Sequence, residues 1–177
     1  MKDTKKDFHQ ALMDSAYNKW GKNKEWNKSQ FFNHLDYLER IAVALGNLNY
    51  QVGNGGFIQW EDNSYKIEHA SFLLELKNEV SKEKYPLLYK GLEITEKAIS
   101  CMDSNPIDDD WDDDEYNDEI DIRNKELSKF DSEYYKLCVF DWDKDKKERK
   151  GIEDDMIMFL EDKNRKIDYL VGIKKGK

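Results

Sequence analysis

Acidic residues are the most prominent candidates for chemistry in this sequence. Residues 103–121 hold eleven aspartates and glutamates and no lysine or arginine. Four acids in this run fall at positions 1, 3, 5 and 12 of an EF-hand calcium loop, namely Asp108, Asp110, Asp112 and Glu119. The loop needs glycine at position 6 for its sharp turn, and this chain has Asp113 there. Calcium binding is therefore the weaker interpretation of the run, and we expect no metal site.

Histidine and cysteine spacings form no recognisable catalytic or metal-binding motif. His9, His34 and His69 make no HxxxH or HExxH pair, which would place two ligands on one helix face. Cys101 and Cys138 are the only cysteines and lie in no CxxC motif, so we expect two free thiols. No serine occupies a GxSxG elbow. The prediction is a protein that is not an enzyme and that carries no cofactor.

A glycine-rich stretch at residues 49–60 is the second candidate. Three of the nine glycines fall within four positions here, so a phosphate-binding loop has to be considered. Ile58 stands where a GxGxxG loop needs its third glycine, and no Lys-Ser/Thr pair follows. We therefore predict a structural turn that ends a helix at Gly53 or Asn54 and returns the chain to the core. The turn residues are Gly53, Asn54, Gly55, Gly56 and Phe57.

Hydrophobic periodicity predicts the elements that position these residues. Apolar residues recur every three to four positions along most of the chain, and no hairpin signal interrupts them. The 177 residues suit one domain, 1–177, which we predict to be an all-α bundle of about seven helices with an acidic loop between helices. The predicted helices cover residues 3–21, 29–52, 57–61, 65–80, 85–102, 120–140 and 148–162. Residues 167–173 are consistent with an extension of the last helix or a short strand.

The charge of the chain is concentrated in the acidic segment. Without its eleven acids, the formal net charge of −9 would become +2. Such a segment repels the phosphates of nucleic acid, so a basic protein surface is the expected partner. A solvated acidic loop that keeps the protein soluble is the simpler interpretation. From charge density alone, the predicted partner-binding residues are Asp108, Asp109, Asp110, Asp112, Asp113, Asp114 and Glu115.

Two short segments also carry a family resemblance. Asn54-Gly55-Gly56-Phe57 directly follows a long amphipathic helix, and Leu127–Tyr135 reads Leu-Ser-Lys-Phe-Asp-Ser-Glu-Tyr-Tyr. Together they resemble a bacterial family, formerly filed as a domain of unknown function, over a core of about residues 29–162. Its best-known member is an acidic DNA mimic that occupies the DNA-binding face of a transcriptional regulator. The resemblance implies DNA mimicry and a homodimer, but it assigns no role to individual acids.

These observations favour an acidic protein-interaction module, a DNA mimic that binds a basic DNA-binding protein. An immunity or antitoxin-like inhibitor of a toxin would use the same electrostatics and is the alternative. The third hypothesis is a calcium-binding protein, or an enzyme or metal-dependent protein that uses the glycine turn with Glu61 and Asp62. Residues 1–7 lead into no apolar segment and no apolar run approaches about 20 residues, so we expect a cytoplasmic protein.

Overall fold

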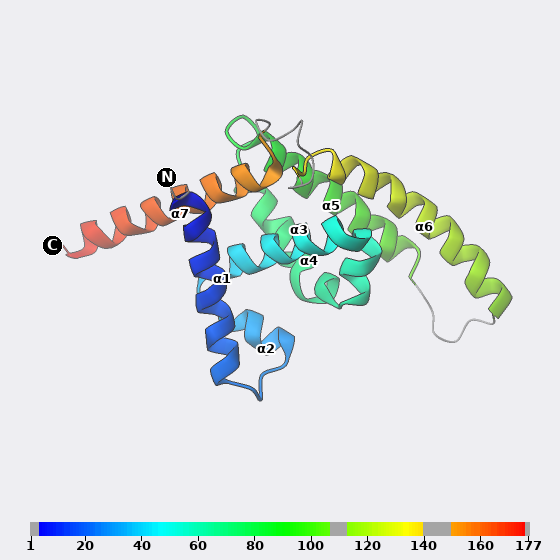
Figure 1. Cartoon of the computed structure of the whole chain (residues 1–177), viewed down its shortest axis with the longest axis horizontal. Coiled ribbons are helices and arrows are strands. Elements are labelled where there is room, and N and C mark those ends of the chain that lie inside the picture. The colour runs from blue at the N-terminus through cyan, green and yellow to red at the C-terminus, as the bar shows by residue number, and fades with distance from the viewer. Residues whose placement is uncertain (1–3, 107–112, 140–149, 176–177) are drawn as a thin grey trace.

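The chain folds into a bundle of α-helices (Figure 1). The computed structural model describes residues 4–106, 113–139 and 150–175, with side chains for 8–106, 121–139 and 150–167. Within these residues there are seven helices and no strand, which confirms the predicted all-α class. The helices are α1 (Thr4–Lys22), α2 (Lys28–Asn33), α3 (Tyr37–Asp62), α4 (Tyr65–Lys77), α5 (Pro86–Ser104), α6 (Asp113–Tyr135) and α7 (Ile152–Lys175).

Helix α3 is the centre of the bundle. Its 26 residues span about 39 Å, and it packs against α1, α4, α6 and α7. Five consecutive residues, Ile41 to Leu45, are at most 1% exposed, so this part of the helix is covered on all sides. A helix that is apolar all round belongs in a protein core, and the sequence Ile-Ala-Val-Ala-Leu meets that requirement.

The helix predicted over residues 29–52 is wrong in its start, because two helices share this stretch. Asn27 caps α2, accepting a 2.8 Å hydrogen bond from the Gln30 amide, while the Gln30 side chain accepts one from the Asn27 amide. The chain then breaks before α3, where the Asp36 amide donates to Glu39. At the start of each helix, two polar residues three positions apart therefore form a capping box.

The predicted helix end at Gly53 or Asn54 is also wrong. The helix continues through both residues, and non-helical angles occur only at Gly55 (φ −151°) and Gly56 (φ 77°). Gly56 adopts the left-handed region, which glycine enters without steric cost. The stretch is therefore a kink inside α3, after which Phe57 resumes the helix and is fully buried, as predicted.

The acidic segment is not only a loop between helices. Helix α6 begins at Asp113, seven residues earlier than predicted, and ends at Tyr135. Helix α7 begins at Ile152 and runs through residues 167–173, so that stretch extends the last helix and forms no strand. Aspartate and glutamate in a first turn interact favourably with the helix dipole, which explains a helix start inside an acidic run.

Two helices extend beyond the bundle in opposite directions. Figure 1 shows the N-terminal half of α6 projecting past the other helices at one end and the C-terminal part of α7 projecting at the other. None of the described helices combines the length and apolar character that crossing a bilayer requires.

Candidate partner-binding site on helix α6

Helix α6 has one face toward the bundle. Arg123, Leu127 and Tyr134 are each at most 3% exposed, and their spacing of four and seven residues places them on one side of the helix. Asp121 is exposed. The helical register places positions 114 and 118 on the same face as Asp121, opposite Arg123, over about 10 Å of helix axis.

The first nine residues of α6 are a dense line of negative charge. Six of them are acids and none is basic, which gives about 2 Å of helix axis per charge. Duplex DNA carries one charge per about 1.7 Å when both strands are counted. The density of the helical segment therefore matches that of the duplex. The six acids are Asp113, Asp114, Glu115, Asp118, Glu119 and Asp121.

The structure places three of the seven predicted partner-binding acids. Asp113, Asp114 and Glu115 form the first turn of α6. The remaining four lie outside the described residues: Asp108, Asp109, Asp110 and Asp112. Asp118 and Asp121 were not among the predicted residues, because their alignment with position 114 follows only from a helix that starts at residue 113.

The EF-hand match does not form the loop it would require. Its positions 6 to 12 are residues 113–119, and all of them lie in α6. An EF-hand loop turns sharply at position 6 and offers a backbone carbonyl to the ion at position 7. A continuous helix uses those carbonyls for its own hydrogen bonds, so the calcium interpretation of this spacing is wrong.

A carboxylate anchors α6 to the kink in α3. The Phe57 amide donates a 2.7 Å hydrogen bond to Oδ1 of Asp131 in α6. The kink leaves this amide at the start of a new helical segment, where no intrahelical acceptor is available. A Cβ atom on Gly56 would collide with the same carboxylate, so glycine permits the close approach. Burial raises the pKa of Asp131, and the hydrogen bond from Phe57 opposes that shift.

This contact also decides against a phosphate-binding turn. The Asp131 carboxylate already accepts the hydrogen bond of the Phe57 amide and lies close to Gly56. A phosphate at the same place would meet that negative charge at close range, which is unfavourable. Of the predicted turn residues, Gly56 and Phe57 therefore take part in anchoring α6.

Aromatic packing reinforces the anchor. The Phe57 and Tyr134 rings pack edge to face with centroids 5.8 Å apart, and Trp60 packs against Phe57 in the same way at 6.4 Å. All three side chains are almost fully buried. The two segments that carry the family resemblance, 54–57 and 127–135, are thus in direct contact in the fold.

An ion-pair network holds the middle of α6. The buried Arg123 guanidinium pairs with Glu61 at the end of α3. Lys66 of α4 lies 3.4 Å from Glu61 and 2.7 Å from Asp103 of α5. Glu61, a candidate for chemistry in the third hypothesis, is therefore shared between two cations, while Asp62 is exposed.

Cys138 follows the end of α6, where its Sγ donates to the Tyr134 carbonyl oxygen at 3.6 Å, while the histidines belong to α1, α4 and the end of α2. Among the described residues, no three His, Cys, Asp or Glu side chains are grouped so that they could hold a metal ion. Cys101 and Cys138 are both free thiols, and burial raises the pKa of Cys138 to about 11. A thiol with that pKa is protonated at neutral pH and is a poor nucleophile.

Comparison with known proteins identifies one family. A family model described as DMP19-like protein matches residues 33–149. This range includes the kink in α3, the acidic run and all of α6. Neither the curated proteins nor the solved structures contain a match to the chain.

Proposed function

Because the chain belongs to the family of DMP19-like proteins, whose model matches about two thirds of its length, we propose that it acts as a DNA mimic. It is an acidic interaction module that presents the N-terminal half of α6 to the DNA-binding face of a basic protein. The observation that carries this proposal is the row of six acids, without a basic residue, in the first nine positions of an anchored helix.

The helical form of the acidic segment matters for this function. DNA holds its phosphates at fixed intervals, so a mimic gains from charges that are fixed before binding. A helix has already lost most of its backbone freedom, and it therefore loses less conformational entropy on binding than a loop does. The Phe57–Asp131 contact and the Arg123–Glu61 pair hold the other half of the same helix to the bundle.

The proposed partner has a surface of lysine and arginine side chains that normally neutralise phosphates. Binding of this kind weakens as salt rises, and duplex DNA competes for the same surface. The protein would then control the activity of its partner by occupying the DNA-binding site.

Capture from host lysate at low and high salt, with and without competitor duplex DNA, tests the proposal. The expected result is a basic DNA-binding protein that is retained at low salt and displaced by duplex. Two variants with the same change in charge sharpen the test. The site variant is Asp114→Asn with Asp118→Asn and Asp121→Asn; the control is Glu25→Gln with Glu75→Gln and Glu83→Gln, three exposed acids outside α6.

The site variant should lose affinity for the captured protein and show a shallower dependence on salt, whereas the control variant should bind like the original. Equal binding by both variants would refute a mimic surface on α6. Capture of one protein that resists both salt and duplex, with no effect of either variant, would instead identify a specific inhibitor of the immunity or antitoxin type.

A further inference from the structure

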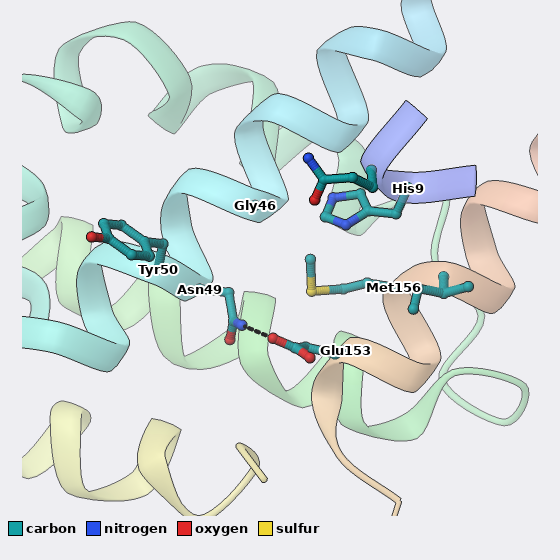
Figure 2. Close-up of a pocket in the computed structure, with 8 residues that line it drawn as sticks. His9, Gly46, Asn49, Tyr50, Glu153 and Met156 are labelled. Carbon is teal, nitrogen blue, oxygen red and sulfur yellow. Dashed lines mark hydrogen bonds between the residues drawn. The ribbon is translucent and has the colours of Figure 1, made fainter. Parts of the chain in front are cut away.

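Residues of α1, α3 and α7 line a cleft. In Figure 1, α1 and α7 lie on the side of the molecule away from the acidic end of α6. The cleft has a volume of about 230 Å³. Figure 2 shows His9 of α1 and Met156 of α7 beside this space, with Asn49 of α3 and Glu153 of α7 joined by a hydrogen bond at one side. The proposed mimic function makes no use of this cleft.

The cleft has an apolar wall. Met156 is 2% exposed, and its thioether points across the space toward α3 (Figure 2). Ile157 adds a half-buried aliphatic side chain, and Gly46 lines the opposite side without one. Tyr50, 66% exposed, lies at the rim. This lining suits the apolar body of a compact ligand.

The polar side chains of the cleft mainly offer hydrogen-bond acceptors. His9 Nε2 lies 3.3 Å from the Ala42 carbonyl oxygen. That oxygen can only accept, so Nε2 carries the proton and Nδ1 is an acceptor. Burial lowers the pKa of His9, which keeps the ring neutral at pH 7. Gln10 uses its amide nitrogen to bind Asp14, and this leaves its carbonyl oxygen as an acceptor.

Glu153 is the one first-turn acid of α7 that faces this cleft. The other two are engaged elsewhere: Asp154 accepts a backbone amide at 2.7 Å, and Asp155 pairs with Lys150. Glu153 accepts a 2.9 Å hydrogen bond from Nδ2 of the Asn49 side chain, and among the described residues the structure places no cation against it. Among the side chains that the structure describes, those lining the cleft include no lysine or arginine.

We propose that this cleft binds a small organic cation, a primary ammonium or guanidinium group on a compact apolar body. The Glu153 carboxylate would receive the charged donor, and Met156 and Ile157 would contact the apolar part. The volume lies below the roughly 300–1,000 Å³ of drug-sized sites, so the ligand has few heavy atoms. This inference is independent of the partner that binds α6.

Binding of benzylamine, with benzyl alcohol as its uncharged counterpart, tests the inference by two-dimensional NMR of the ¹⁵N-labelled protein. Benzylamine should shift the amide signals of Gly46, Asn49 and Glu153 and bind at least about tenfold more tightly than benzyl alcohol, as a charge-assisted hydrogen bond implies. Glu153→Gln keeps an acceptor for Asn49 and removes the charge, so it should abolish the preference. Glu83→Gln, at an exposed acid outside the cleft, should preserve it.

Three results would overturn the proposal. They are equal affinity of the original protein for the two compounds, shifts confined to other parts of the molecule, and no shift of these amides at about 10 mM benzylamine, ten times a millimolar Kd. The comparison of the two compounds on the original protein decides the matter even if Glu153→Gln fails to fold.

Discussion

The amide of Phe57 and the carboxylate of Asp131 meet at 2.7 Å, although 74 residues separate them in the sequence. Phe57 opens the helical segment after the kink in α3, and Asp131 lies in the anchored half of α6. One hydrogen bond thus both completes a helix start and fixes the helix that carries the acidic row. The stability of the kink and the position of α6 are therefore expected to depend on the same side chain.

Replacement of Asp131 tests this anchor. Asp131→Ala leaves the Phe57 amide without an acceptor, so the free energy of unfolding should fall by about 1–3 kcal/mol, while Asp131→Asn keeps an acceptor and should cost less. Urea denaturation measures both. Glu133→Ala is the control, because Glu133 is exposed on the same helix and should change stability by no more than about 0.5 kcal/mol. Equal losses at residues 131 and 133 would contradict the anchor.

Glycine substitutions probe the kink. Gly56→Ala puts a side chain at φ 77° and against Asp131, and we expect a loss of about 1–3 kcal/mol in unfolding free energy. At Gly21, in contrast, a Cβ would meet nothing within 4 Å. Gly21→Ala should therefore stabilise α1 by up to about 1 kcal/mol, since alanine is the better helix former. If Gly56→Ala proved neutral in the same denaturation assay, the close approach would be wrong.

His69 should make the fold sensitive to acid. It is 1% exposed beside the Phe32 ring, and burial lowers its pKa from 6.5 to about 4, with a smaller contribution from Lys28. The unfolded chain takes up a proton below pH 6.5 while the folded ring does not. The contribution of His69 to the free energy of unfolding is thus fully present above pH 6.5, and that free energy falls by up to about 3 kcal/mol as the pH drops toward 4.

Thermal unfolding between pH 4 and pH 7 measures this effect. His69→Phe removes this titrating group and should reduce the slope, of which His9, whose pKa burial also lowers, keeps a part; His34→Gln, at an exposed histidine, should leave the slope as it was. If the melting temperature of His69→Phe fell with pH as steeply as that of the original protein, the acid sensitivity would come from other groups.

A proline in the acidic half of α6 separates helical geometry from charge. Asn117→Pro removes an amide donor and clashes with the carbonyl of residue 113, so the helix should begin near residue 117 and release its first turn. The net charge is unchanged, and affinity for the captured partner should nevertheless fall. Asn117→Ala is the control. Undiminished binding by the proline variant would mean that charge density alone is sufficient.

Hydrophobic periodicity was enough to predict the fold class and several elements. The helix predicted over residues 85–102 is α5, whose start also follows from a proline in the first turn, and Phe57 and Trp60 are buried as expected. The kink was misplaced because three glycines allow several stops. The kink forms at Gly55 and Gly56, where Asp131 of α6 bonds the adjacent Phe57 amide. No local sequence pattern predicts this contact.

The candidate site was less predictable than the fold. The acidic run was evident from composition, but the start of α6 at Asp113 was not. A dense acidic run is typical of a loop, and only the favourable interaction of acids with a helix start favours the opposite outcome. The pairing of Arg123 with Glu61 joins residues 62 positions apart, and sequence patterns do not encode such contacts.

The long separation between Phe57 and Asp131 also bears on how the protein is made. At about 5–20 residues per second, a ribosome needs roughly 4–15 s to add the 74 residues between them. During that time the nascent chain lacks the carboxylate that completes the kink in α3. The acidic helix is therefore expected to dock late, so newly made chains would acquire the proposed binding surface only after most of the bundle has been synthesised.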